Sequence, residues 1–309
     1  MNEFYTALLD RLNGNSVKCQ EPMENHTTFR VGGPAQYYVS VASIPELKEG
    51  LACCREYKVP AYVLGNGSNV LVSDKGITGV VFQLDADFSK ISIEPVDAQK
   101  VLVRAQAGAM LGRLGAQIAK EGLTGFEWAA GIPGTVGGAV YMNAGAYGGE
   151  MKDIITEVTV LTRDLQVEKR SLERLELGYR SSALMQEQAY VLEAVFALER
   201  GEPEKIAERM QELASRRREK QPLEYPSAGS TFKRPEGYFA GKLIQDAGLR
   251  GYRVGGAQVS EKHCGFVINR EKATAQDIYQ LTEDVRRIVK EKFGVVLERE
   301  IRLLGEFPC

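Results

Sequence analysis

Residues 131–139 read GIPGTVGGA, and a further run, NAGA, follows at residues 143–146. A segment so rich in glycine loses more conformational entropy on folding than an ordinary connection does. Inside a compact domain such a segment usually has a functional reason, often a backbone that approaches a ligand closely. Apolar residues interleave with the glycines at Ile132, Val136 and Val140, which favours a packed loop over the alternative of a flexible surface loop. The stretch therefore predicts a packed loop that a ligand can approach.

An earlier glycine-rich turn lies within LGNGSNVLV at residues 64–72. Gly65 and Gly67 permit backbone conformations that are closed to other residues, so several N–H groups can point at one phosphate. The alternative is a plain tight turn between two strands. A Rossmann fingerprint requires a third glycine and a helix directly after it, whereas a strand-like run follows here. Two separated glycine loops can hold the two phosphates of one dinucleotide, in a fold other than the Rossmann fold.

The composition of the whole chain limits the class of protein. Its 309 residues suggest about two domains, and 44% hydrophobic with 26% charged residues is an ordinary globular balance. The net charge of -2 gives no basic field that would attract nucleic acid. The five cysteines include no Cys-x-x-Cys pair and only two histidines accompany them, which argues against a metal site and fits a reducing compartment. With no signal-like start and no long apolar run, we expect a soluble, cytoplasmic protein with no membrane or nucleic-acid partner.

Helix-like and strand-like patterns alternate along the chain. Ser43, with Glu46 three residues later, predicts a capped helix start. Residues 125–149 carry no regular pattern, and Pro203 marks a domain boundary near residue 200. The class is therefore α+β or mixed α/β. Strands are predicted at 35–41, 61–64, 70–73, 100–106, 153–164, 189–199 and 295–304, and helices from Ser43, from about Met110, at 203–219 and at 275–293.

Short motifs spread over nearly the whole chain carry a family resemblance. They are NHTTFRVGG (25–33), GNGSN (65–69), GIPG (131–134), GYRSS (178–182), AGSTFK (228–233) and LERE (297–300). In this order they resemble the UDP-N-acetylenolpyruvoylglucosamine reductases, a family of the vanillyl-alcohol-oxidase-like FAD-binding fold. The short link between Arg180 and Ser230 resembles the shorter, type II subclass, so a tyrosine that covers substrate in the longer subclass has no counterpart here.

The resemblance implies both a fold and an activity. The implied fold is α+β, with a two-part FAD-binding domain of the vanillyl-alcohol oxidase (PCMH) type over residues 1–200, divided at about residue 83. A C-terminal α/β domain for the UDP-sugar substrate would follow at 201–309. The implied activity is that of UDP-N-acetylmuramate dehydrogenase, in which NADPH reduces FAD and flavin N5 delivers a hydride to UDP-N-acetylglucosamine enolpyruvate. The product serves peptidoglycan synthesis, hence cell-wall biogenesis, cell shape and cell division, and we expect the enzyme to be a monomer.

Three residues match the catalytic positions of that family. Ser230 matches the proton donor, and Arg180 matches the arginine that faces the substrate carboxylate, for which a guanidinium fork is well suited. Glu300 matches the acid beside the same carboxylate, and a protonated Glu300 could donate a hydrogen bond as charge develops there. The residues alone leave other interpretations open: a polar turn for Ser230, a surface salt bridge for Arg180 and a solvated strand face for Glu300.

The resemblance also assigns binding residues. Noncovalent FAD is expected, because neither histidine (His26, His263) and none of the cysteines lies in the central glycine segments. Lys220 matches a lysine suited to stabilise the alkoxide left on the serine, and no metal is expected. The expected cofactor-binding residues are Arg30, Gly65, Asn66, Gly67, Ser68, Asn69, Ala107, Gly108, Gly131, Ile132, Pro133, Gly134, Thr135, Gly137, Gly138, Ala139 and Asn143. The expected substrate-binding residues are Lys220, Arg234, Lys242, Arg250, Tyr252 and His263.

Two other functions are compatible with the residues. One is a different FAD-dependent oxidoreductase of the same fold that acts on a small alcohol. The other is a non-catalytic UDP-sugar-binding protein, which would need no flavin loops. The absorbance spectrum of the purified protein, before and after NADPH and then substrate, distinguishes all three.

Overall fold

The structure is a computed structural model, and it describes residues 3–12, 17–84 and 86–308. The chain divides into two compact units, each assembled from separate segments. The first unit takes the described residues of Met1–Lys18, Tyr38–Asn66 and Val80–Arg216, and the second takes Cys19–Tyr37, Gly67–Gly79 and Arg217–Cys309. Each unit is described by itself below.

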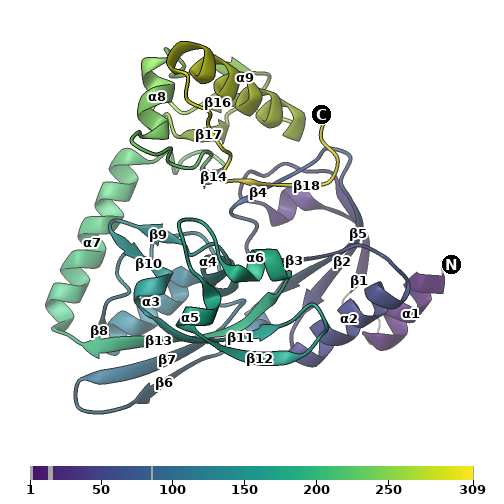
Figure 1. The fold of residues 1–309 in the computed structure, drawn as a ribbon, viewed down its shortest axis with the longest axis vertical. Coiled ribbons are helices and arrows are strands. Elements are labelled where there is room, and N and C mark those ends of the chain that lie inside the picture. Colours follow the sequence, from purple (N-terminus) through teal and green to yellow (C-terminus); the bar gives the residue numbers. More distant parts are fainter. Residues whose placement is uncertain (1–2, 13–16, 85, 309) are drawn as a thin grey trace. The chain divides into compact units, whose positions relative to one another are not determined.

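An antiparallel sheet forms the centre of the first unit, with strand order β12-β11-β13-β7-β6 and the short β8 paired to β13 (Figure 1). Helix α4 packs against β13 and β7. The strands are β6 (Ile91–Pro95), β7 (Lys100–Gln106), β8 (Leu123–Thr124), β11 (Ile155–Leu161), β12 (Val167–Ser171) and β13 (Tyr190–Arg200), and a small hairpin joins β9 (Gly145–Ala146) to β10 (Gly149–Glu150). The helices are α1 (Glu3–Arg11), α2 (Ile44–Glu56), α3 (Leu111–Lys120), α4 (Val136–Tyr141), α5 (Leu172–Leu175) and α6 (Ala183–Glu187).

The residue pattern explains these elements. In β7 the residues Val101, Val103 and Ala105 are buried while their neighbours are not, as expected for a strand with one face on the core. In α3 the buried residues Leu111 and Ile118 lie on one apolar face.

The chain passes between the units at five points, and one of them lies in the turn between Asn66 and Gly67. The other four lie within β1 (Val17–Pro22), β2 (Pro34–Val41), β5 (Ile77–Leu84) and helix α7 (Pro203–Lys220). A four-stranded sheet has the order β1-β2-β5-β3, in which β3 (Ala61–Leu64) runs parallel to β5.

The second unit contains an antiparallel sheet of order β14-β17-β16-β15. Helix α9 packs against β15, β16, β17 and α8, and β18 pairs in parallel with β4. The bounds are β4 (Val70–Val72), β14 (Ser227–Ser230), α8 (Ala240–Asp246), β15 (Arg253–Val254), β16 (Ala257–Val259), β17 (Phe266–Asn269), α9 (Ala275–Phe293) and β18 (Arg302–Leu304).

Two early segments of the chain belong to the core of this second unit. Phe29 and Leu71 are buried in the same cluster as Ile278 of α9. The carboxylate of Asp74 accepts hydrogen bonds from the first N–H groups of α9, at Ala275 and Gln276, both at 2.8 Å. A carboxylate is favoured at a helix N-terminus, where N–H groups lack intrahelical partners. These contacts explain why residues 19–37 and 67–79 group with the C-terminal third.

Most predicted elements are found close to their predicted places. Helix α2 begins after Ser43, whose Oγ accepts a hydrogen bond from the N–H of Glu46 at 3.3 Å, as expected. Two predictions were wrong in detail. Residues 125–149 contain helix α4 and the β9–β10 hairpin, because glycine-rich helices lack the apolar periodicity on which the prediction relied. The strand expected at 295–304 is limited to Arg302–Leu304, with one isolated bridge between Phe232 and Arg299.

The domain boundary near residue 200 was predicted from Pro203, which begins helix α7. The chain leaves the first unit for the last time after Arg216, within α7. The division into a cofactor domain over 1–200, in two parts, and a substrate domain over 201–309 stays a prediction.

Candidate active site

The glycine segment 131–139 packs in the first unit against the loop that follows β7. The N–H of Val136 donates to the carbonyl of Ala109, and the N–H of Gly137 donates to that of Ala107, both at 2.8 Å. A Cβ on Gly137 would lie 2.8 Å from the Cβ of Ala107, so only glycine allows this approach. The predicted cofactor residues of 107–108 and 131–139 are thus brought together.

Gly65 and Asn66 lie beside the same segment. Asn66 Nδ2 donates to the carbonyl oxygen of Pro133 at 2.7 Å. A Cβ on Gly65 would lie 2.2 Å from Thr135 Oγ1, so the two loops pack in direct contact. Gly65 and Asn66 therefore form one surface in the first unit with the glycine segment, which follows them by more than sixty residues in sequence.

Backbone donors at this surface lack partners. The N–H groups of Asn66, Gly134 and Thr135 donate to no acceptor within the described parts of the chain. Unpaired backbone N–H groups in glycine-rich turns are donors that can bind an anion. The arrangement fits a phosphate-bearing group.

Arg180 lies in a tight turn of the first unit. Gly178 and Ser181 exchange backbone hydrogen bonds of 3.1 and 3.3 Å, and Arg180 between them has a φ of +52°. Its Nη2 donates to the carbonyl of Gly145 at 3.3 Å, and its guanidinium lies 5.0 Å from the ring centroid of Tyr179. The stacked ring and the hydrogen bond orient a half-buried cation.

Asn143 contacts this turn through its side chain. It is 0% exposed, and its Nδ2 donates to the carbonyl of Gly178 at 2.9 Å. Asn143 was predicted to bind the cofactor, and in the structure its side chain forms hydrogen bonds with other protein groups.

Ser230 and Glu300 lie in the second unit, and Thr231 connects them. Ser230 is exposed at the end of β14, after Gly229 with a φ of +73°. Thr231 is 0% exposed, and its carbonyl accepts a hydrogen bond from the N–H of Glu300 at 2.9 Å. Its Oγ1 accepts from the N–H of Val267 at 3.0 Å. Ser230, the predicted proton donor, is therefore linked to Glu300, the predicted acid, by the backbone hydrogen bond of the neighbouring Thr231.

The other residues of the GNGSN turn also belong to the second unit. Asn69 Nδ2 donates to the carbonyl of Glu300 at 3.2 Å, so Glu300 is held on both sides of its backbone. The carbonyl of Gly67 accepts from the N–H of Thr28 at 3.2 Å. Arg30 is exposed, with a φ of +54°. The cofactor roles predicted for Arg30, Gly67, Ser68 and Asn69 stay predictions.

The predicted substrate cations are distributed over the second unit, and several are paired with protein groups. Lys242 forms an ion pair with Asp246 at 2.5 Å, and Arg250 donates to Gln245 at 2.8 Å. Arg234 lies 3.9 Å above the ring of the exposed Phe239, while Lys220 is exposed at the end of α7.

Two other predicted substrate-binding residues, His263 and Tyr252, have shifted pKa values. Burial lowers the pKa of His263, whose Nδ1 accepts from the N–H of Gly265 at 3.1 Å, so the neutral ring is favoured. A hydrogen bond to Asp284 raises the pKa of Tyr252, whose hydroxyl donates to that carboxylate at 3.0 Å.

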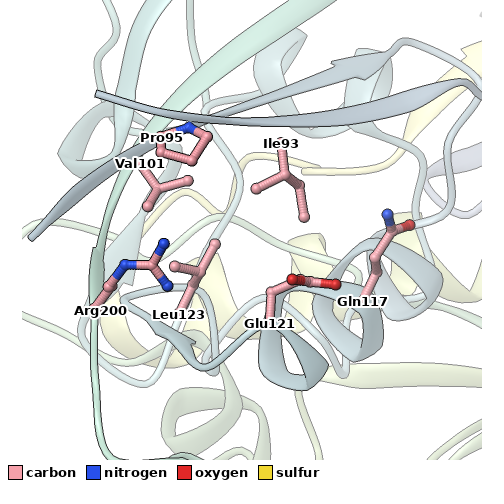
Figure 2. A pocket seen from close by; sticks show the side chains of 7 residues that line it. All are labelled: Ile93, Pro95, Val101, Gln117, Glu121, Leu123 and Arg200. Carbon is pink, nitrogen blue, oxygen red and sulfur yellow. The ribbon is translucent and has the colours of Figure 1, made fainter. Parts of the chain in front are cut away.

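A hollow of about 290 Å³ lies apart from these residues in the first unit (Figure 2). It contains none of the predicted site residues. The hollow is lined by Ile93, Pro95, Val101, Gln117, Glu121, Leu123 and Arg200.

Two kinds of feature are absent from the described residues. Among them no cluster of three or more His, Cys, Asp or Glu could hold a metal ion. Within the same residues no helix is both long and apolar enough to span a bilayer.

Comparison with known proteins assigns the chain to a family. A model of the FAD binding domain matches residues 35–169, and a model of the UDP-N-acetylenolpyruvoylglucosamine reductase C-terminal domain matches residues 221–304. A UDP-N-acetylenolpyruvoylglucosamine reductase of Lachnoclostridium phytofermentans is 56% identical over 290 residues, covering 94% of this chain and 93% of the relative. This chain belongs to the UDP-N-acetylenolpyruvoylglucosamine reductase family. A second reductase of the family, from Clostridium botulinum, is 49% identical over 306 residues and 99% of each chain.

Solved structures agree with this assignment. The UDP-N-acetylenolpyruvylglucosamine reductase of Thermus caldophilus has a TM-score of 0.80 and 36% identity, covering 94% of this chain and 99% of that chain. A VAO-type flavoprotein of Myceliophthora thermophila C1 has a TM-score of 0.51 and 14% identity, covering 65% of this chain and 47% of that chain, which shows a shared fold. The predicted FAD-binding fold and family are confirmed.

Sequence reasoning missed two residues, Thr231 and Asp74, whose hydrogen bonds stabilise the second unit. Thr231 follows Ser230 within the AGSTFK motif, yet nothing in the motif says that its hydroxyl binds Val267. Asp74 gave no signal either, because the helix that it caps begins two hundred residues later in the chain.

Proposed function

We propose that this chain catalyses the NADPH-dependent reduction of UDP-N-acetylglucosamine enolpyruvate to UDP-N-acetylmuramate, a step in peptidoglycan precursor synthesis. The observation that carries the proposal is the near full-length match to UDP-N-acetylenolpyruvoylglucosamine reductases. The connection of Ser230 with Glu300 through Thr231 supports it.

The glycine-rich loops of the first unit are proposed to hold phosphate oxygens of FAD. In the first unit the unpaired N–H groups of Asn66, Gly134 and Thr135 would bind phosphate oxygens. Residues 107–108 pack against this surface and would complete it. When FAD is bound and reduced, it supplies a hydride to the terminal carbon of the enolpyruvyl group.

Arg180 and Glu300 are proposed to stabilise the charge that develops on the substrate carboxylate. The guanidinium of Arg180 is oriented by Tyr179 and offers parallel N–H donors, which match a planar carboxylate. Glu300 would act in its protonated form, as a donor whose hydrogen bond strengthens as charge grows. These contacts act most strongly in the transition state, where the charge is largest.

Ser230 is proposed to give its proton to the carbon next to the carboxylate. Its position at the exposed end of β14 leaves the hydroxyl accessible. Lys220 would stabilise the alkoxide that remains, because a cation lowers the free energy of a nearby oxyanion.

The remaining parts of the proposal concern the substrate and the setting of the enzyme. The UDP portion would contact Arg234, Lys242, Arg250, Tyr252 and His263 in the C-terminal domain. We further propose that the enzyme is a cytoplasmic monomer, with the FAD-binding domain in residues 1–200 and the substrate domain in 201–309.

Stopped-flow measurement of the two half-reactions tests the function. Ser230→Ala should leave flavin reduction by NADPH at the wild-type rate and slow flavin reoxidation by substrate by about 10²–10⁴-fold. Ser227→Ala, on the same strand, is the matched control and should change neither step. Slow reduction by NADPH combined with normal reoxidation would contradict the role of Ser230.

The mode of FAD attachment has a separate test. Acid precipitation of the purified protein should release all the yellow colour into the supernatant. Colour that stays in the pellet would contradict noncovalent binding.

A further inference from the structure

The side chain of Asn143 is fully engaged inside the first unit. Nδ2 donates to Glu150 Oε2 at 2.7 Å and to the carbonyl of Gly178 at 2.9 Å, and Oδ1 accepts from the N–H of Lys152 at 3.0 Å. These partners fix the orientation of the amide, because two acceptors face Nδ2 and a donor faces Oδ1. With its amide hydrogens used and 0% exposure, the side chain does not face a ligand.

The backbone at Asn143 does not by itself require asparagine. Asn143 follows α4 with a φ of +42°; its N–H donates to Val140 at 3.1 Å, and the N–H of Ala144 donates to Ala139 at 2.8 Å. This is the Schellman pattern at a helix C-terminus, where glycine is the common residue. Asparagine tolerates the same left-handed conformation, and it adds an amide that glycine lacks. The amide is therefore the reason for asparagine at this position.

Two of the contacts that hold Arg180 lead back to Asn143. One is the turn Gly178–Ser181, which contains Arg180 and whose first carbonyl accepts from Asn143. The other is Gly145, which accepts from the Arg180 guanidinium at 3.3 Å and pairs with Glu150 across the β9–β10 hairpin. Glu150 in turn accepts from the same Asn143 amide. The Asn143 side chain thus connects the turn that contains Arg180 with the β9–β10 hairpin that the Arg180 guanidinium contacts.

We propose that Asn143 is a positioning residue that aims Arg180 at the carboxylate of the substrate, and that it is not a ligand of FAD. The proposal rests on the proposed role of Arg180. Bidentate recognition of a carboxylate needs an aligned guanidinium, so loss of the connection lowers the rate of the step in which that carboxylate gains charge. A misplacement of about 1 Å can cost about 10²-fold in rate.

Asn143→Gly tests the proposal, because glycine keeps the left-handed backbone and removes only the amide. The apoprotein should bind FAD with unchanged affinity in a fluorescence titration. Flavin reduction by NADPH should keep the wild-type rate, while reoxidation by substrate should slow by up to about 10²-fold. In the apoprotein, hydrogen exchange of the peptide that covers residues 178–182 should become faster. Gln188→Gly is the matched control, since Gln188 also follows a helix with a positive φ, of +55°, and should leave both half-reactions unchanged.

The double variant of Asn143→Gly and Arg180→Lys distinguishes failure of the role of Asn143 from failure of the role of Arg180. Asn143→Gly and Arg180→Lys should be less than additive on reoxidation, as expected for residues that act through one group. Additive effects, unchanged reoxidation in Asn143→Gly, or weaker FAD binding with normal reoxidation of the bound flavin would each overturn the role of Asn143 alone. If Arg180→Lys reoxidises at the wild-type rate, the proposed role of Arg180 itself fails.

Discussion

Replacement of Thr231 by valine should destabilise the second unit and impair the reductive chemistry at the same time. Thr231 is 0% exposed, and its hydroxyl is the acceptor for the N–H of Val267 at 3.0 Å. Valine keeps the shape and leaves that buried N–H without a partner, which costs about 1–3 kcal/mol. Serine keeps the hydroxyl and removes one methyl group, worth about 0.8 kcal/mol. Thr231→Val should therefore lower the free energy of unfolding by about 1 kcal/mol more than Thr231→Ser.

Urea unfolding followed by circular dichroism measures the stability difference, and hydrogen exchange at Val267 locates it. The same variants should differ in flavin reoxidation by substrate, with valine slower, because Thr231 lies next to Ser230 and binds the backbone of Glu300. Equal stability of the two variants, together with unchanged protection of the Val267 amide, would refute this account of Thr231.

Other residues give independent tests. Burial lowers the pKa of His263 below 6.5, so its contribution to stability is complete above that pH and is lost as pH falls through the folded value. Urea midpoints at pH 7.5 and 5 should fall more in the wild type than in His263→Asn, and equal falls would contradict the shift. Burial raises the pKa of Cys54 to about 12, so in a Cys309→Ser background a disulfide reagent at pH 8 should modify the exposed Cys19 and leave Cys54 unmodified until unfolding, as read by mass spectrometry. Asp74→Ala should lower stability by about 0.5–2 kcal/mol and speed hydrogen exchange in the first turn of α9, whereas exchange at the wild-type rate there would contradict the capping role of Asp74.

Local patterns could be predicted from the sequence because they depend on neighbours in the chain. The buried face of α3, with Leu111 and Ile118, follows from helical spacing, and the start of α2 follows from the side chain of Ser43. The family, its fold and its cofactor were also predicted, from motifs whose order is specific. Helix α4 was missed, because a glycine-rich helix has too few apolar side chains to show a period.

The supporting contacts of the site could not be predicted, because their partners are distant in sequence. Asn69 was assigned to the cofactor from its motif, and that motif gave no sign that its amide binds the carbonyl of Glu300. Asn143 was assigned in the same way, and its amide joins Glu150 to Gly178. A motif records that a residue type is needed, whereas only the tertiary structure shows which group it contacts.

The discontinuous make-up of the second unit limits how genes of this family can recombine. A crossover near codon 217 would transfer α9 without its Asp74 cap and β18 without its partner strand β4. It would also separate Phe29 from the core in which Ile278 packs. Functional chimaeras between relatives should therefore inherit residues 19–37 and 67–79 from the same parent as the C-terminal third.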